Sequence, residues 1–395
     1  MAQATSHIDR PRHRAARPQL AGLDRRGVVA GLALVAVVLA LVYVGSEGLR
    51  WFDAALAGYL MGTLLAVFAV VYRYVVWIER PPTRALRARG WQAFWGSGRR
   101  LRSIVHLPDV LWRHLVGQGF IMRRSVSRWF AHQCLFWGCV LAALVTFPLT
   151  FGWLHFESVG QDDGRYQAYV AGWGTVEFES RSFMGFMMFH ALDVAAVLVL
   201  VGVFVFLVRR LRDPGAMAVE RSNDFLALAG LFAVSVTGLM LTVSSLWLDG
   251  RLYTFISTVH AATVILGLLY IPFGKLFHIF QRPGTVGLAY TRGRWDDEPP
   301  ALCRECGEPY APATQVHDLR AVLPEVGFDY DIGPAPAPAR FGADGADVPD
   351  GNREGGLGGD GDGQGGGHGS YQEVCPRCRR RLVALAQSVR VGGFG

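Results

Sequence analysis

Charged residues are scarce in this sequence. Only 18% of its 395 residues are Asp, Glu, Lys or Arg, whereas 51% are hydrophobic. Soluble domains carry about 25% charged residues, so the composition excludes a wholly soluble chain and indicates membrane helices with a smaller soluble remainder. Lysine is almost absent, and arginine supplies nearly all of the positive charge behind the formal net charge of +7.

Other patterns are also missing. We expect no cleavable signal peptide, because the polar, arginine-rich residues 1–26 are too long for a typical n-region and no credible small-residue cleavage site follows. The sequence shows no internal repeat and no broken helices in inverted repeats of the kind that secondary transporters contain. The net positive charge does not indicate a nucleic-acid-binding protein, because the arginines lie beside apolar runs, as the positive-inside rule expects.

Six apolar runs are long enough to cross a bilayer as helices. They cover residues 28–44, 54–77, 129–153, 183–208, 225–246 and 253–280. The loops at 78–128 and 209–223 are rich in arginine, whereas the loop at 154–182 is acidic. The sequence therefore predicts an all-α integral membrane protein of the cell (inner or plasma) membrane, with about six transmembrane helices and both termini in the cytoplasm.

The composition divides the chain into five parts. In order, they are a basic cytoplasmic tail, two N-terminal transmembrane helices, amphipathic helices on the cytoplasmic surface, a four-helix membrane domain and a second cytoplasmic tail, at 1–26, 27–80, 81–127, 128–283 and 284–395. The second tail contains an insert at 333–370, rich first in Pro and Ala and then in Gly and Asp. Such a composition buries too little apolar surface to fold, so we expect the insert to be disordered.

Two CxxC pairs flank the insert. The stretch CRECG contains Cys303 and Cys306, and CPRC contains Cys375 and Cys378. This spacing favours a four-cysteine metal site in a reducing compartment over disulfides. A zinc ion in a structural zinc ribbon is the first expectation. The CxxCG…CPxC form also resembles rubredoxin, so a redox iron is the alternative.

Four histidines lie within the apolar runs at two matching depths. His132 and His278 lie near the cytoplasmic ends of the third and sixth runs, and His190 and His260 lie nearer the outer side. On a continuous helix, the eighteen residues from His260 to His278 make five turns, so both rings would project from one face about 27 Å apart. Two level pairs match two bis-histidine haems. The alternative is that each histidine is a packed or hydrogen-bonded residue.

Three of these runs resemble helices of the respiratory nitrate reductase gamma subunit. STVHAATVILGLLYIPFGKLFHIFQRP is similar to that family's last membrane helix, NDFLALAGLFAVSVTGLMLTV to the preceding helix, and FAHQCLFWGCVLAALVTFPLTFG to its earlier haem-ligand helix. The resemblance covers about residues 125–290 and extends to the membrane cytochromes of heterodisulfide-reductase and dissimilatory sulfite-reductase complexes. It implies a membrane cytochrome b with His132, His260 and His278 as haem ligands.

The sequence departs from this family at one ligand position. The family has a second histidine ten residues after the first, where this chain has Ala142. The outer haem therefore lacks its usual partner for His260, and we place His190 there by depth. If His190 does not ligate, the protein holds one haem b instead of two, between His132 and His278.

Together, these features predict a di-haem b-type cytochrome that passes electrons from quinol, such as menaquinol, to a cytoplasmic reductase subunit. By resemblance, that partner contains molybdenum or iron–sulfur centres. Asp193, one turn from His190, and His155, in the outer loop, are candidates for a quinol site. Each also has a plainer interpretation, as a paired acid and an interfacial histidine. Two other classes stay open: a haem-free transporter, and a membrane anchor that presents a zinc-binding module.

Overall fold

The computed structural model describes residues 23–96, 100–160, 164–212, 222–295, 298–328, 331–332 and 369–382. They fall into two compact units, which are treated separately below. The membrane unit comprises Gly22–Arg80 and Phe94–Gly287, and the cysteine unit comprises the described parts of Pro81–Ala93 and Leu288–Gly395. Most of the expected tail at 1–26 and of the insert at 333–370 lies outside the described residues.

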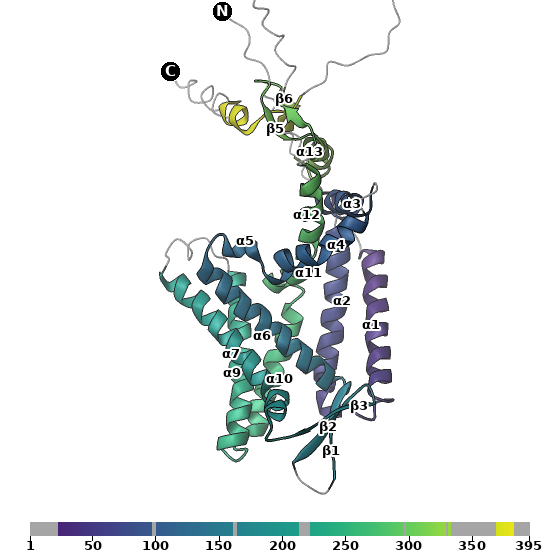
Figure 1. Ribbon diagram of the computed structural model, residues 1–395, viewed down its shortest axis with the longest axis vertical. Coiled ribbons are helices and arrows are strands. Elements are labelled where there is room, and N and C mark those ends of the chain that lie inside the picture. The colour runs from purple at the N-terminus through teal and green to yellow at the C-terminus, as the bar shows by residue number, and fades with distance from the viewer. Residues whose placement is uncertain are drawn as a thin grey trace, which may run out of the picture. The chain divides into compact units, whose positions relative to one another are not determined.

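Six helices of the membrane unit are long and apolar enough to cross a bilayer, which makes this a multi-pass membrane protein. Figure 1 labels them α1 (Arg25–Gly45), α2 (Ala57–Glu79), α6 (Val126–Thr150), α7 (Phe183–Arg212), α9 (Ser222–Trp247) and α10 (Tyr253–Tyr270). Local capping sets where two of them begin: the carboxylate of Asp24 accepts from the N–H of Gly27, and the hydroxyl of Ser125 accepts from the N–H of Arg128.

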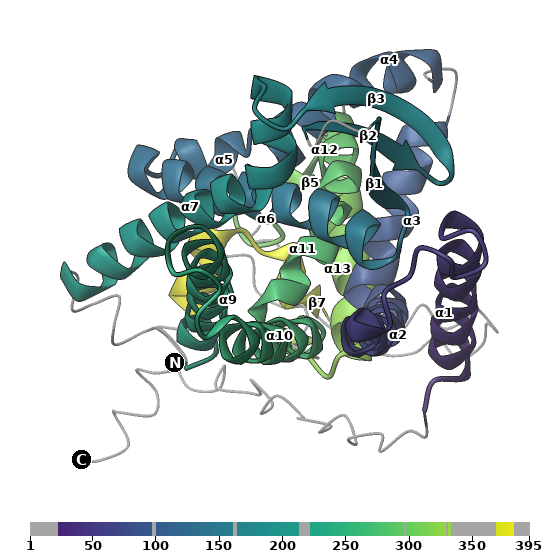
Figure 2. The same cartoon turned by 90° about the horizontal axis from the view of Figure 1, so that it is seen from below.

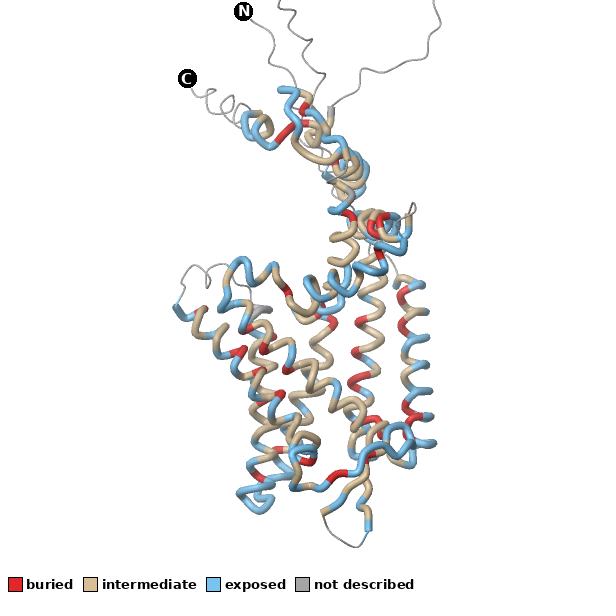
Figure 3. Tube along the Cα trace, in the orientation of Figure 1, coloured by how far each residue is buried: buried red, intermediate tan, exposed pale blue. Residues whose placement is uncertain are grey.

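The six helices pack as a series of neighbours. Helix α1 packs on α2, α2 on α10, α10 on α9, α9 on α7, and α7 on α6 (Figure 2). Small residues allow the closest approach, because a Cβ added at Gly138 of α6 would lie 2.7 Å from Val199 of α7. Figure 3 shows the buried residues of α1 on the side that faces α2, whereas many apolar side chains on the other helix faces are exposed. Such apolar exposure suits contact with lipid.

A small antiparallel sheet follows α6, and the expectation of an all-α chain did not include it. Its strands β1 (Leu154–Ser158), β2 (Arg165–Val170) and β3 (Trp173–Glu179) pair in that order. Residues between β2 and β3 make a two-residue turn, in which Ala171 and Gly172 have φ angles of 50° and 82°. Positive φ at both positions is the tight-hairpin geometry that suits the twist of paired strands.

The sixth membrane segment, a single apolar run at 253–280 in the sequence, is broken in the structure. Helix α10 ends at Tyr270, and the chain continues through a 3-10 turn, η3 (Lys275–Phe277), into the short helix α11 (His278–Gln281). Pro272 has no N–H to donate, and its ring would clash with the carbonyl of Leu268 in a regular helix, which favours a break at this position. The five-turn spacing of His260 and His278, which assumes a continuous helix, therefore does not apply.

Short helices connect α2 to α6, as the amphipathic pattern predicted. They are α3 (Pro81–Trp95), α4 (Arg100–Leu111), the π-helix η2 (Trp112–Val116) and α5 (Gly119–Met122). Most of α3 belongs to the cysteine unit, whereas α4, η2 and α5 belong to the membrane unit.

The cysteine unit is built from short strands, helices and turns. The elements are α12 (Gly284–Trp295), which starts in the membrane unit, β4 (Pro300–Leu302), β5 (Pro309–Pro312), α13 (Ala313–Glu325), β6 (Asp331–Ile332), β7 (Gly369–Ser370) and the 3-10 turn η4 (Tyr371–Glu373). Pairing of β6 with β7 brings the two ends of the long insert together.

Ion pairs hold α13 against α3. The guanidinium of Arg89 forms two hydrogen bonds with Asp318, from Nε to Oδ2 at 2.8 Å and from Nη2 to Oδ1 at 2.7 Å. Arg84 and Glu325 form a second, more exposed pair at 2.9 Å. The hydrogen bond with Asp318 raises the pKa of Arg89. A bidentate pair is geometrically specific, so we assign the main role in fixing α13 to Arg89 and Asp318.

We predict that Arg89→Leu loosens α13. The pair is partly exposed, so its loss should cost about 1 kcal/mol of local stability and raise amide exchange of α13 about fivefold in the full-length protein. Hydrogen–deuterium exchange with mass spectrometry measures this. The charge-swapped protein, Arg89→Asp with Asp318→Arg, should recover part of the protection. Equal exchange in wild type and Arg89→Leu would show that the pair does not hold the helix.

Candidate functional site

Two histidines from different segments meet in the membrane unit. His132 lies in the second turn of α6, and His278 is the first residue of α11, directly after the broken segment. Their ring centroids are 6.5 Å apart, with an interplanar angle of 76°. Two imidazoles that bind one metal ion from opposite sides, with metal–nitrogen bonds of about 2 Å, have ring centres about 6 Å apart. The separation therefore leaves room for one metal ion between the rings.

The ring nitrogens also suit metal binding. In His278, Nδ1 lies 2.7 Å from the carbonyl oxygen of Lys275, so Nδ1 carries the proton and donates it, and Nε2 keeps a free lone pair. Metal-bound histidines commonly use the second nitrogen in this way. In His132, Nδ1 is buried and has no hydrogen-bond partner among the described residues. A buried ring nitrogen without a partner costs free energy, which a ligand could recover.

Positive charge surrounds this pair. Arg282 acts electrostatically on both His132 and His278, and Lys275 acts on His278. The guanidinium of Arg282 lies 4.7 Å from the ring centroid of Phe120, which orients it. A haem carries two propionate carboxylates, and Arg282 and Lys275 are the residue types that bind such groups. The donor set thus fits a haem with two axial imidazoles.

His260, on α10, is held by α9. Its Nδ1 lies 2.9 Å from Oγ1 of Thr237, and that hydroxyl donates to the carbonyl of Ala233 at 2.7 Å, so it accepts from the imidazole. Gly238 makes room for the ring, because a Cβ there would lie 3.3 Å from Cε1 of His260. This contact leaves Nε2 of His260 without a described hydrogen-bond partner.

His190, on α7, belongs to a polar triad with Asp193 and Thr242. Its Nδ1 lies 2.8 Å from Oδ2 of Asp193, and the hydroxyl of Thr242, on α9, donates to Oδ1 at 2.7 Å. The triad opens into an apolar cavity of about 570 Å³ between α7 and α9, which reaches Trp247. Both carboxylate oxygens are therefore occupied, whereas Nε2 of His190 is the ring nitrogen left for a ligand.

The structure brings together one of the two expected histidine pairs. His132 and His278 are neighbours, but His190 and His260 form no ring contact with each other in the described chain. His260 contacts α9 at Thr237, whereas His190 is linked to α9 through Asp193, which accepts from Thr242. The predicted outer haem site is thus not assembled by these two rings as they stand.

His155 lies on β1 and is enclosed by aromatic rings. The ring of Trp51 stacks on it at 4.0 Å and that of Tyr169 at 5.1 Å, with interplanar angles of 11° and 2°. Its Nδ1 is buried and has no partner among the described residues. Because both faces are covered, a quinol head group has no free face of His155 on which to stack.

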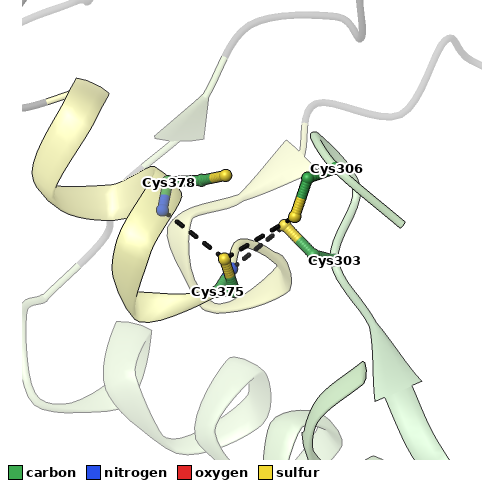
Figure 4. A group of neighbouring side chains, drawn as sticks. All are labelled: Cys303, Cys306, Cys375 and Cys378. Carbon is green, nitrogen blue, oxygen red and sulfur yellow. Dashed lines mark hydrogen bonds between the residues drawn. The ribbon is translucent and has the colours of Figure 1, made fainter. Parts of the chain in front are cut away.

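The four cysteines converge in the cysteine unit, as Figure 4 shows. Their sulfur atoms all lie within 4.8 Å of one another, and Sγ of Cys306 is 3.8 Å from Sγ of Cys375. Sulfur atoms around a tetrahedral zinc, with bonds of about 2.3 Å, are about 3.8 Å apart. The predicted four-cysteine cluster is confirmed, and all four cysteines are free of disulfides.

The two cysteine pairs lie in different kinds of backbone structure. Cys303 and Cys306 lie in the β4–β5 turn, where the N–H of Gly307 donates to the carbonyl of Cys303 at 2.8 Å. Gly307 has a φ of 73°, which favours glycine. Cys375 directly precedes the helical residues 376–382, so the second pair lies at a helix start.

The thiols differ in acidity. Burial raises the pKa of Cys303, but N–H groups of Cys375, Cys306 and Glu305 donate toward its sulfur and bring the pKa down to about 6. Interaction with Cys375 raises the pKa of Cys378 to about 12. Thiolates at such short distances repel each other, and a bound divalent cation removes that repulsion.

Sequence reasoning missed several supporting residues. The hydroxyl of Thr237 accepts from His260, the hydroxyl of Thr242 donates to Asp193, and the carbonyl of Lys275 fixes the tautomer of His278. A hydroxyl within an apolar run is a weak signal for the threonines. The Lys275 contact depends on the helix break and has no signal in the sequence.

Comparisons with protein-family models, with curated proteins and with solved structures give no match to this chain.

We predict that the purified protein contains about one zinc ion per chain at the cysteine cluster. Replacing Cys375, which is buried among the other sulfurs, by Ser should abolish stoichiometric binding, as measured by elemental analysis. Because thiolates bind the metal and protons compete for them, zinc affinity should fall as the pH falls. The matched control is Cys139→Ser, in α6, which should keep the metal. Iron in place of zinc would favour the rubredoxin-like alternative, and an unchanged metal content in Cys375→Ser would contradict the site.

Proposed function

We propose that this protein is a membrane b-type cytochrome that carries electrons from quinol to a reductase partner. The observation that carries the proposal is the approach of His132 and His278, whose ring centroids are 6.5 Å apart. The resemblance of residues 125–290 to nitrate reductase gamma subunits supports it independently. A bis-histidine haem takes one imidazole from each of two facing segments, as α6 and α11 provide.

When bound, a haem would supply one-electron chemistry. In this proposal, His132 and His278 hold its iron, and Arg282 and Lys275 neutralise its carboxylates. The hydrogen bond from His278 to the carbonyl of Lys275 fixes the imidazole orientation and makes Nε2 more basic. The proposal contains one haem, because a second one would need His190 and His260 to be brought together.

Oxidation of a quinol to a quinone releases two electrons and two protons. The electrons would pass one at a time to a bound haem, one proton needs an acceptor at the quinol, and the other can leave to the aqueous phase. In the cavity between α7 and α9, Nε2 of His190 can accept a proton, and Asp193 stabilises the resulting imidazolium. The apolar walls suit an isoprenoid chain. His190 then acts on quinol and does not bind haem, and His155 has no part in the site.

The proposed orientation in the membrane rests on charge. By the positive-inside rule, we propose that the arginine-rich loops at 78–128 and 209–223 lie on the cytoplasmic side, with His132 and His278 near that surface. Electrons would leave there to a molybdenum or iron–sulfur reductase subunit of the type that accompanies the resembling family. The membrane is then the cell membrane.

One observation favours a second function. The cysteine cluster is complete without any contribution from the membrane helices, so the spans would also serve as an anchor that presents a zinc-binding module. In that case the protein would bind zinc and no haem.

We predict a b-type α-band in the reduced-minus-oxidised optical spectrum of the purified protein. His132→Ala and His278→Ala should each remove most of the low-spin haem signal, because loss of either axial ligand breaks the bis-histidine site. His106→Ala and His114→Ala, in α4 and η2, are matched controls and should keep the band. A protein that binds no haem under haem-sufficient expression, or bands unaffected by both ligand variants, would overturn the proposal.

We predict that Asp193→Asn slows haem reduction by a menaquinol analogue about a hundredfold, because the carboxylate no longer stabilises the protonated imidazole. Stopped-flow absorbance measures the rate, and reduction by dithionite should be unchanged. Asp249→Asn, in the turn between α9 and α10, is the control. Equal quinol rates in wild type and Asp193→Asn would remove the triad from the mechanism.

A further inference from the structure

The broken segment between α10 and α11 leaves a backbone carbonyl to be satisfied. Gly274 has extended backbone angles, φ −92° and ψ −169°, so the chain leaves the helical path before the carbonyl of Pro272 finds its usual backbone donor. Within a bilayer, an unsatisfied carbonyl costs several kcal/mol. Irregular backbone at this depth therefore needs a side-chain donor.

Arg73 of α2 is that donor. Its Nη1 donates to the carbonyl of Pro272, a residue 199 positions further along the chain. An arginine inside a transmembrane helix is rare and needs a partner. Here the partner is a carbonyl that the break leaves without its helical backbone donor.

The same guanidinium contacts the segment at a second point. Its Cζ lies 4.3 Å from the ring centroid of Phe277, which is 2% exposed and is among the largest fully buried side chains of the described residues. A cation over an aromatic face is attractive, and more so away from water. Arg73 thus contacts residues at both ends of the stretch 272–277, immediately before His278.

We propose that Arg73 is a positioning residue that holds the segment 271–277 in the conformation that turns His278 toward His132. The inference rests on the proposed function where it concerns haem, because His278 would be an axial ligand. Arg73 does not touch the iron; it acts through Pro272 and Phe277. Helix α2, which lies outside the stretch that resembles nitrate reductase gamma subunits, would thereby contribute to the site.

The first test needs no haem. Hydrogen–deuterium exchange of residues 273–278 is measured for the full chain in lipid nanodiscs, with Arg73→Leu, Arg73→Lys and the control Arg50→Leu. Like Arg73, Arg50 lies over an aromatic ring, that of Trp51 at 5.1 Å, but it makes no described contact with residues 271–277. We expect exchange about tenfold faster in Arg73→Leu, an intermediate rate in Arg73→Lys and no change in Arg50→Leu. Exchange as slow in Arg73→Leu as in wild type overturns the inference. If Arg73→Leu fails to fold, Arg73→Lys is the test: exchange faster than in wild type supports the inference, and exchange as slow as in wild type overturns it.

The second test concerns the ligand. Haem titration of the same proteins should show about tenfold weaker binding in Arg73→Leu, with loss of low-spin character, because the segment that orients His278 is no longer held. Unchanged affinity and spectrum, despite faster exchange, would overturn the positioning role. If wild type binds no haem, the cytochrome proposal fails by itself, and the exchange measurement still decides whether Arg73 holds the segment.

Discussion

The break after Tyr270 is the constraint on which the candidate site depends. In a continuous helix, His278 would lie about 12 Å beyond Tyr270 along the helix axis, and the helix alone would set the direction of its side chain. Pro272 prevents that continuation, and the chain instead turns through η3 into α11. His278 consequently gains a hydrogen bond to Lys275 and lies beside His132. The backbone irregularity that brings the imidazoles together is tolerable in a bilayer because Arg73 satisfies it.

Some of this architecture could be predicted from the sequence. Uninterrupted apolar runs are specific enough to give six membrane helices, and CxxC spacing is specific enough to give the cysteine cluster, because both signals are local. The pairing of Asp193 with His190 also follows from a three-residue helical spacing. The pairing of His132 with His278 was expected from depth alone, and the two rings do lie together.

The remaining features depend on contacts between distant residues. Proline can kink or end a membrane helix, and which occurs depends on whether another helix satisfies the freed backbone. Arg73 does so from 199 residues away, and no local pattern records that contact. Thr242 completes the carboxylate pairing of Asp193 from another helix. The β1–β3 sheet was missed because its acidic residues were read as a loop, although its aromatic content and its turn suit strands.

The two units contain two different kinds of chemistry. In the membrane unit, hydrogen bonds hold Nδ1 of His190, His260 and His278, whereas Nδ1 of His132 is buried without a partner among the described residues. In the cysteine unit, backbone N–H groups and neighbouring sulfurs prepare a site for a soft divalent ion.

The central claim is that His132 and His278 bind one iron from opposite sides. Near-infrared magnetic circular dichroism of the oxidised wild-type protein tests it most directly, because the energy of the ferric charge-transfer band identifies the pair of axial ligands. The account predicts a low-spin band characteristic of two imidazoles. A high-spin ferric spectrum, a band from any other ligand pair, or the absence of haem would contradict it.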